Sequence, residues 1–487
     1  MRDFVRWSWD VLEPETPLQW NWHIDAICDH KEAQFFDWLA IRKALKKGET
    51  PPPMRMQNLV MNVPPGSTKS RIMMVDYPAW VWLHAPTWHG ICVSSAKLAT
   101  RDSLLTRRLI ESDWYQEWFQ PEWGFTADQN AKLNFINTLG GQREAITPGA
   151  SIVGNRGDEL LMDDLNDPDD ENESAKREQI NDWWDMGAGN RLNDLRYSMR
   201  SMIQQRMHHE DATGHFTQSM EWVKVVIPME FEPSRATKTP IGWIDPRMIS
   251  GELMFPARFP ASVIEQEKKR LGTYGYQGQY QQEPSPPGGS IFKESWFGSY
   301  KSLPAMKEVW TAWDTALKTK EENDESALVT IGLGEDGNLY VLRMWHGREE
   351  TPDIARRLIQ HAGHLRQLYG DRYRGDYIED APGGTALMQY LRRTSSALAV
   401  IPIRAATDKV SRAHVVSPIC EAGRVLLPDP WAYAKVSGWR RDLLANLTSF
   451  PKASHDDITD AFVYAVKRFM SSMGTGKSRR GTAGGWV

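Results

Sequence analysis

The sequence has few cysteines, no long apolar segment and no excess of basic residues, and each shortage excludes a class of protein. Only three cysteines occur in 487 residues, and they are too widely spaced for a disulfide framework or a paired zinc motif (Cys28, Cys92 and Cys420). No run approaches the ~20 apolar residues of a membrane-spanning helix. The charged start, MRDFVRWSWD, also lacks the apolar region of a signal peptide. We therefore expect a soluble, intracellular protein that does not bind membranes.

The overall composition is that of an ordinary globular protein with more than one core. Hydrophobic residues make up 41% and charged residues 25% of the chain, and the formal net charge is −5. A chain of 487 residues exceeds what one core usually organises, so two domains are expected. The acidic balance does not exclude a nucleic-acid partner, because phosphate contacts need only local Lys/Arg clusters and metal sites themselves require carboxylates.

The first half of the chain has the pattern of a parallel sheet with crossover helices. Residues 1–55 predict a helical segment that belongs to the first domain and ends at the prolines 51–53. Residues 56–280 then alternate helical stretches with short apolar runs, which are NLVMNV, GICVSS, ELLMDD and MRSMIQQR. Sheets of this kind bind ligands at the carboxyl ends of their strands. The polar segment 281–290, QQEPSPPGGS, predicts a linker.

The second half predicts a different sheet over residues 291–470. Three strands are expected from VWTAWD, SALVTIGL and LYVLRMW, the last two joined by a turn at residues 335–338. Helices over 351–369 and 384–393 flank the strand DYIED, and the last helix ends in ITDAFVYAVKRF. Three antiparallel strands followed by alternating helices and parallel strands is the order of a ribonuclease H-like domain. The Gly/Ser/Arg-rich segment 471–487 predicts a flexible tail.

The segment VPPGSTKS resembles a phosphate-binding loop. In the GxxxxGK[ST] loop, backbone N–H groups hold phosphates, the lysine reaches the β/γ oxygens and the hydroxyl holds Mg²⁺. Lys69 and Ser70 stand in the right places after an apolar strand, but Val63 and Thr68 replace the two glycines. A plain strand-to-helix turn is therefore the alternative. The loop residues expected to contact a nucleotide are Pro65, Gly66, Ser67, Thr68, Lys69 and Ser70.

The strand ELLMDD supplies the acids that an ATPase needs beside such a loop. Asp163 is placed to hold Mg²⁺ and Asp164 to orient the attacking water, although many ATPases carry the longer Glu at the second position. The alternative is a solvated acidic loop, because NDPDDENE follows directly. The lysine loop and the acidic strand end together favour an ATPase that uses ATP and Mg²⁺.

Three acidic clusters in the second half have the pattern of a metal-dependent nuclease. Two-metal phosphodiester cleavage requires carboxylates that hold cations ~4 Å apart, and Mg²⁺ or Mn²⁺ would serve. The candidates are Asp314, Glu379 and Asp380 at strand ends, and Asp456, Asp457 and Asp460 at a helix start. Glu379 and Asp380 point to opposite faces of a strand, so only one should bind metal directly. Asp456 and Asp460 share a helical face and Asp457 is rotated by about 100°. An N-cap role for SHDD is the alternative, and it is compatible with metal binding.

These motifs, in this order, resemble the large terminase subunit of tailed bacteriophages, the motor that packages DNA into a procapsid. The resemblance extends from about residue 15 to 470 and includes VPPGSTKS, RGDELLMDDLNDP, YQGQYQQEPSPPGG, WDTALKT, YIEDAPGGTAL and SHDDITDAF. It implies an N-terminal P-loop ATPase domain of the ASCE type with a parallel sheet. It also implies a C-terminal ribonuclease H-like nuclease domain with a mixed sheet. The implied activities are ATP-driven translocation of double-stranded DNA and metal-dependent cleavage of concatemeric DNA.

The resemblance also implies roles for individual residues. Lys69 and Ser70 would bind triphosphate and Mg²⁺, and Asp163 and Asp164 would complete hydrolysis. Glu379 is favoured over Asp380 as the nuclease metal ligand. Gln19, in PLQWNWHIDAI, would contact adenine, with helix capping as the alternative.

Two further implications concern motion and assembly. The segment 204–206 would couple hydrolysis to movement. Motors of this family act as rings in which an arginine completes the neighbour's ATP site. Arg156 is the candidate and Arg143 the alternative, and either could instead be an ordinary surface charge.

The resemblance names the partners as well. They are double-stranded DNA, the small terminase subunit, the portal protein of the procapsid and further copies of this chain in a ring, although the isolated chain could be monomeric. The place of action would be the host cytoplasm. Two other functions compete with this one: a DNA repair or recombination nuclease with a regulatory ATPase domain, and a non-catalytic capsid or portal adaptor. The presence of both carboxylate sets argues against the adaptor.

Overall fold

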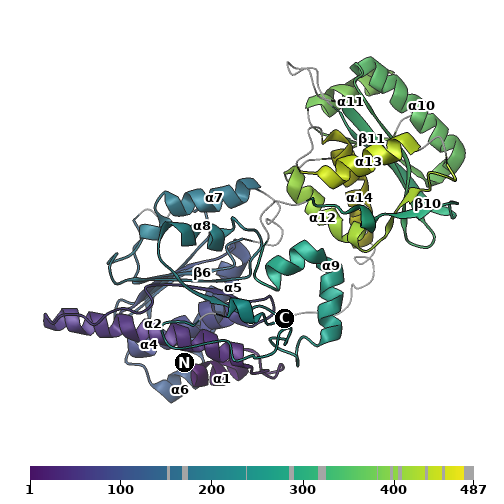
Figure 1. Cartoon of the computed structure of the whole chain (residues 1–487). Helices are drawn as coiled ribbons and strands as arrows, with labels where there is room; N and C mark the ends of the chain where they lie inside the picture. Colours follow the sequence, from purple (N-terminus) through teal and green to yellow (C-terminus); the bar gives the residue numbers. More distant parts are fainter. Residues whose placement is uncertain are drawn as a thin grey trace. The chain divides into compact units, whose positions relative to one another are not determined.

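The computed structural model of the chain divides into two compact units, which are described separately (Figure 1). The structure describes residues 1–150, 154–166, 174–236, 238–284, 290–315, 325–380, 382–394, 399–403, 408–433, 437–451 and 456–475. The first unit comprises Met1–Lys268 and Thr273–Pro286, and the second Lys269–Gly272 and Pro287–Val487. Part of the expected linker 281–290 lies outside the described residues.

The first unit is built on an eight-stranded sheet in the order β3-β4-β5-β2-β6-β7-β1-β8. Its strands are β1 (Asn58–Asn62), β2 (His89–Val93), β3 (Phe125–Asn130), β4 (Asn134–Asn137), β5 (Gln142–Ile146), β6 (Glu159–Asp163), β7 (Met199–Gln204) and β8 (Val223–Val226). The four apolar runs form β1, β2, β6 and β7, which confirms the predicted parallel strands. The antiparallel extension by β3 and β4 was not predicted, because these strands lack an apolar run.

Helices cover both faces of this sheet (Figure 1). The helices along this part of the chain are α1 (Arg2–Leu12), α2 (Trp22–Lys47), α3 (Lys69–Arg71), a π-helical turn (Ile72–Asp76), α4 (Tyr77–His84), α5 (Ala96–Glu111), α6 (Asp113–Phe119), α7 (Ser174–Asp185), α8 (Ala212–Ser219) and α9 (Ala261–Gln279). Trp183 and Trp184 of α7 pack with Phe216 of α8 against the sheet. On α2, the buried Lys31 is paired with Glu159 of β6 and donates to Ser201 of β7. These contacts attach α2, α7 and α8 to the sheet.

The second unit contains a seven-stranded sheet in the order β14-β13-β10-β11-β12-β15-β9. The strands are β9 (Gly298–Tyr300), β10 (Met306–Asp314), β11 (Ser326–Gly334), β12 (Leu339–Gly347), β13 (Tyr373–Glu379), β14 (Val400–Ile403) and β15 (Val425–Pro428). β10, β11 and β12 are antiparallel, and β13 and β14 join beside β10 in parallel. This is the predicted ribonuclease H-like order. β15 and β9 extend the sheet beyond β12 and were not predicted as its strands.

The two faces of the second sheet are covered by different helices. The helices are α10 (Thr351–Tyr369), α11 (Pro382–Thr394), α12 (Lys409–Glu421), α13 (Ser437–Ser449) and α14 (Asp457–Thr475). α10 and α11 form one core with Trp313 and Ile378, and the others form a second core with Trp310 and Val329. α14 continues to Thr475, so the expected tail 471–487 begins as helix, and the residues beyond lie outside those described. None of the helices in the described ranges is long and apolar enough to cross a membrane.

Candidate active sites

The lysine loop connects β1 to the helical run that begins at Lys69. Its backbone turns through two left-handed residues, Gly66 with φ 71° and Thr68 with φ 64°. Thr68 stands where the usual motif has its second glycine, and a β-branched residue in this conformation stores about 1–3 kcal/mol of strain. The loop therefore keeps its turn without the glycine, at an energetic cost.

The acids of β6 meet the loop at the carboxyl edge of the sheet. Lys69 Nζ lies 3.0 Å from Asp164 Oδ2. Ser70 donates its hydroxyl hydrogen to Asp163 Oδ1 at 3.0 Å. β7 lies between β1 and β6, so the loop and the acids come from strands that are not adjacent. The structure thus brings together the lysine, the hydroxyl and the two acids identified in the sequence.

Asp163 has the environment of a group that needs a cation. Its side chain is fully buried, and Oδ2 has no hydrogen-bond partner within the described part of the chain. Burial raises the pKa of Asp163 well above its usual value and the charge of Asp164 adds to this, while Lys69 and Ser70 oppose it. A hydroxyl and a carboxylate in contact are ligands that suit Mg²⁺. Ser70 and Asp163 therefore fit a magnesium ion.

A cavity of about 360 Å³ opens in front of the loop. It is lined by Trp9, Glu13, Gly66, Ser67, Thr68, Lys69, Ser70, Arg71, Arg101, Asp102, Leu105 and Arg258. Four of these side chains are cationic, and backbone N–H groups at a helix start also favour phosphate. Of these four cations, only Lys69 was identified from the sequence as a phosphate ligand, and no sequence pattern marked the three arginines. Pro65 and Gln19 are absent from this lining, and Gln19 is exposed, so its adenine contact stays a prediction.

His23 is a site residue that the sequence did not reveal. Its Nε2 lies 3.2 Å from the carbonyl oxygen of Ser67 in the lysine loop, and its Nδ1 lies 2.6 Å from Asn21 Nδ2. Burial lowers the pKa of His23 to about 4, so the ring is neutral and can donate from Nε2 while accepting at Nδ1. His23 lies in the segment that suggested Gln19, and its contact with the loop spans 44 residues of sequence.

The segment that follows β7 contacts the second acid directly. The backbone N–H of Gln205 donates to Asp164 Oδ1 at 3.1 Å. The next N–H, of Arg206, donates to Gln282 Oε1 at 2.9 Å. Gln204 donates to Thr213 Oγ1 at 2.8 Å. Two consecutive backbone N–H groups thus connect Asp164 with the C-terminal end of the first unit, and the coupling role of segment 204–206 stays a prediction.

The two candidate trans arginines differ in burial. Arg156 is exposed and donates to the carbonyl oxygen of Leu192 at 3.2 Å. It precedes β6, whereas Asp163 ends it, and at ~3.3 Å per residue the strand alone separates them by about 13 Å. Arg143 is buried in β5, where it donates to the carbonyl oxygen of Met74. A buried guanidinium has no access to a neighbouring subunit, so the geometry favours Arg156 over Arg143.

The carboxylates of the second unit gather around two cations of α12. Lys409 Nζ lies 2.7 Å from Asp456 Oδ1 and 3.2 Å from Asp460 Oδ2. One ammonium group contacts both aspartates, so they lie on the same side of the start of α14. Of the SHDD segment, Ser454 and His455 lie outside the described residues. Asp457 begins α14.

Glu379 and Asp380 point to different partners. Glu379 Oε1 accepts from the hydroxyl of Tyr464 at 2.6 Å and lies 3.8 Å from Arg412, which also binds Asp460 at 2.8 Å. Asp380 Oδ1 instead accepts from Thr385 at 3.0 Å. The shared arginine places Glu379, rather than Asp380, with the carboxylates of α14.

Asp314 completes this carboxylate group at the end of β10. Burial raises its pKa well above the usual value, and the charges of Asp460, Glu379 and Asp457 raise it further, whereas Lys409 lowers it. Burial also raises the pKa of Asp460, while Arg412 and Lys409 oppose that shift. Crowded carboxylates of this kind require cations to be ionised together. The donor set therefore fits Mg²⁺ or Mn²⁺.

Lys409, Arg412 and Tyr464 were not foreseen from the sequence. Lys409 and Arg412 lie three residues apart on α12, a spacing that puts both on one helical face. That pattern occurs on many solvated helices. Their contact with the acids depends on how α12 packs on α14, which no local pattern reveals.

Comparisons with known proteins bear on the fold of the chain. The family described as the terminase RNaseH-like domain matches residues 311–469. Among solved structures, the large terminase from a thermophilic bacteriophage matches with a TM-score of 0.51 and 11% identity, covering 89% of this chain and 98% of that chain. The HK97 bacteriophage large terminase, at 11% identity, covers 96% of this chain and 99% of that chain with a TM-score of 0.32. No curated protein matches the chain.

The match to the thermophilic phage terminase extends over both units, and the family match lies within the second. At 11% identity the structural comparison establishes the fold and not the details of the sites. It confirms the predicted combination of an ATPase-type domain with a ribonuclease H-like domain in one chain. Residues 311–469 thus resemble the terminase RNaseH-like domain, in a chain that has the two-domain fold of a phage large terminase.

Proposed function

We propose that this chain is the large subunit of a viral DNA-packaging terminase. It hydrolyses ATP to move double-stranded DNA into a procapsid, and it cuts concatemeric DNA at the beginning and end of packaging. The observation that carries the proposal is the presence of two separate acidic sites in one chain of this fold. One lies beside a lysine loop, and the other lies among the strand and helix ends of a ribonuclease H-like sheet.

The roles in ATP hydrolysis follow from the contacts of the first site. Lys69 and the N–H groups of the loop bind the β/γ-phosphates, together with the arginines that line the cavity. Ser70 and Asp163 hold Mg²⁺, which neutralises phosphate charge when bound. Asp164 orients the attacking water, and Gln205 fixes its carboxylate by the hydrogen bond to Oδ1. His23 keeps the loop in place through the carbonyl of Ser67.

The nuclease roles belong to the carboxylates of the second unit. Asp314, Glu379, Asp456, Asp457 and Asp460 hold the divalent ions, which are Mg²⁺ or Mn²⁺ and polarise the scissile phosphate when bound. Tyr464 orients Glu379 by its hydrogen bond. Lys409 and Arg412 balance the charge of the acids, and the half-exposed Lys409 can also contact the DNA backbone.

The partners follow from this activity. Double-stranded DNA is the substrate, and the small terminase subunit and the portal protein of the procapsid are the protein partners. Copies of this chain assemble as a ring on the portal, with Arg156 reaching the ATP site of the neighbour. The place of action is the host cytoplasm.

The test is ATP-dependent packaging of DNA into purified procapsids, measured as DNA protected from added nuclease. Lys69→Ala should abolish packaging and ATP turnover but leave cleavage of DNA intact. Asp314→Ala should abolish cleavage and leave ATP turnover intact. Lys97→Ala, an exposed lysine of α5, is the matched control. ATP turnover that DNA stimulates but procapsids do not, without packaging, would instead favour a repair or recombination nuclease.

A further inference from the structure

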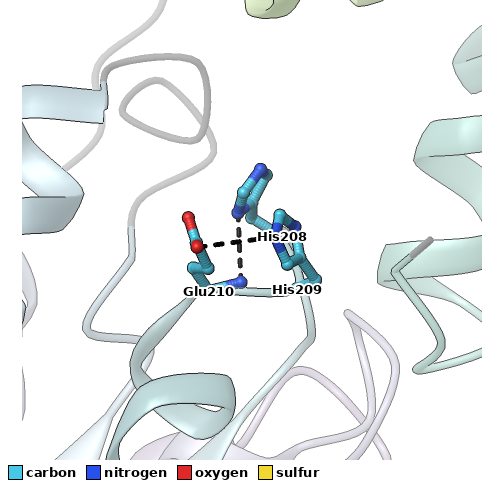
Figure 2. A group of neighbouring side chains, drawn as sticks. All are labelled: His208, His209 and Glu210. Atoms are coloured by element: carbon cyan, nitrogen blue, oxygen red, sulfur yellow. Dashed lines mark hydrogen bonds and ion pairs between the residues drawn. The ribbon is translucent and has the colours of Figure 1, made fainter. Parts of the chain in front are cut away.

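Three potential metal ligands gather on the turn that follows the coupling segment. His208, His209 and Glu210 are consecutive, and one ligand atom of each lies within 4.8 Å of the others. Figure 2 shows the two rings and the carboxylate clustered over the same turn. Of the described residues, these form the one group of histidine, cysteine or acidic side chains this close together.

The buried carboxylate of Asp211 stabilises the backbone of this turn. This fully buried carboxylate accepts from the backbone N–H groups of Met207 and Gly214, each at 2.9 Å. Arg206 Nε donates to both of its oxygens at 2.9 Å. Since the backbone is fixed by these bonds, only side-chain conformational entropy is lost when the three residues close on an ion.

The spacing of the donor atoms matches a transition metal. Two ligands at the ~2.0–2.2 Å distances of zinc, at a tetrahedral angle, lie about 3.4 Å apart. His209 Nε2 and Glu210 Oε1 are 3.6 Å apart. The rings of His208 and His209 have centroids 4.1 Å apart, and one ligand atom of each of the three residues lies within 4.8 Å of the others.

The histidine rings can offer lone pairs to an ion. His209 Nδ1 has no hydrogen-bond partner within the described ranges, and it can carry the proton while Nε2 faces Glu210. His208 Nδ1 accepts the exposed N–H of Glu210 at 3.1 Å, which water can take over.

From these observations we propose that His208, His209 and Glu210 bind one divalent ion of the zinc type. Two imidazole nitrogens and one carboxylate suit Zn²⁺, Co²⁺ or Ni²⁺, whereas Mg²⁺ and Ca²⁺ prefer oxygen ligands alone. Water completes the coordination, because Glu210 is exposed. The site is distinct from the carboxylates of the second unit. A bound ion would restrain this turn, whose Asp211 forms an ion pair with Arg206 in segment 204–206.

The test measures Zn²⁺ binding to the full chain by titration calorimetry and Co²⁺ binding by its visible absorption. His209→Ala and Glu210→Gln should each weaken binding by at least ~10-fold or remove one equivalent of Zn²⁺. The Co²⁺ band from nitrogen ligands should be lost in His209→Ala. His215→Ala is the matched control, because the side chain of His215 is 34% exposed against 27% for His209 and lies outside the cluster.

All of these chains keep the nuclease carboxylates, so any difference between them reports on the turn alone. The readout is metal binding, so its result is independent of ATP turnover and packaging. Thermal unfolding in EDTA checks that each variant is folded. If a histidine variant is destabilised, the test is made with Glu210→Gln, because Glu210 is exposed. Equal stoichiometry and affinity in wild type, His209→Ala and Glu210→Gln would overturn the proposal.

Discussion

The ammonium group of Lys69 lies 3.0 Å from Asp164 Oδ2, so the loop lysine and the acid that follows β6 form an ion pair at the carboxyl edge of the sheet. Bound phosphates would compete with Asp164 for this lysine. Asp164 would therefore lose its ion pair with Lys69 when a nucleotide binds. Because Asp164 Oδ1 also accepts from the backbone N–H of Gln205, a movement of Asp164 would be transmitted to segment 204–206.

Replacing the charge of Asp164 should separate nucleotide binding from hydrolysis. Asp164 has a φ of 38°, and asparagine tolerates the left-handed region as well as aspartate, so Asp164→Asn should keep the backbone. We expect ATP binding to persist and turnover to fall by about 10²-fold or more, the size of a general-base contribution. Steady-state ATPase rates and nucleotide titration measure the two effects. Unchanged turnover would assign the base role to another acid.

Removing the ring of His23 should loosen the lysine loop. His23→Ala deletes the donor to the carbonyl of Ser67 and leaves a buried acceptor unpaired, which costs about 1–3 kcal/mol. We expect nucleotide affinity to fall by about tenfold or more while DNA cleavage is unchanged. His23→Gln, which can still donate a hydrogen bond, should restore part of the affinity. Equal affinity in wild type and both variants would show that the loop does not depend on this contact.

Lys409 should set the metal requirement of the nuclease. Its ammonium group binds Asp456 and Asp460, so it competes with divalent ions for the same oxygens. Lys409→Met should lower the Mg²⁺ or Mn²⁺ concentration needed for half-maximal metal binding and weaken DNA binding at low salt. Asp314→Asn should instead remove cleavage at any metal concentration. If Lys409→Met leaves both metal affinity and DNA affinity unchanged, the lysine has only a structural role.

Buried Asp376 should make the second unit less stable as pH rises. It accepts from Trp313 Nε1 at 2.9 Å and from the hydroxyl of Tyr373 at 2.6 Å, and burial raises its pKa to about 6. The folded chain thus holds a proton that the unfolded chain releases near pH 4. Stability is lost between about pH 4 and pH 6, by about 3 kcal/mol for a shift of two units. Scanning calorimetry should show that the stability of Asp376→Asn, relative to wild type, increases as the pH rises over this range. Parallel pH curves would contradict the shift.

The strands and their acids could be predicted because each signal is local. An apolar run ending in acidic residues marks a buried strand and the sheet edge where its acids lie, and Asp163, Asp314 and Glu379 were found this way. The order of such runs also predicted β1, β2, β6 and β7 of the first sheet and the ribonuclease H-like strand order of the second. The polar strands β3 and β4 gave no apolar run and were missed.

The supporting residues of both sites could not be predicted, because their contacts depend on packing. His23 touches Ser67 across 44 residues, and Tyr464 touches Glu379 across 85. Arg258 reaches the loop from a segment with no phosphate motif. The individual roles of Gln19, Arg156 and the nuclease acids stay predictions.

The exposed Arg156 should act on the ATP site of a neighbouring subunit. It lies at the start of β6, away from the Asp163 of its own chain, and its one described hydrogen bond goes to a backbone carbonyl. An arginine that a neighbouring subunit supplies to the transition state raises the rate of phosphoryl transfer by about 10³-fold or more. We therefore expect Arg156→Ala to bind ATP normally but turn it over about as slowly as the isolated wild-type chain.

Mixing variants tests whether this action occurs between subunits. Arg156→Ala and Lys69→Ala should each be inactive alone. In a mixed assembly, an Arg156→Ala subunit has an intact lysine loop and can receive Arg156 from a Lys69→Ala neighbour, so turnover should reappear and peak near equal proportions. Arg143→Lys is the control: because Arg143 is buried and is not assigned to the neighbour's site, assembled Arg143→Lys subunits should keep their turnover without mixing. Mixtures that assemble but stay inactive at every ratio would show that Arg156 does not complete the neighbour's site.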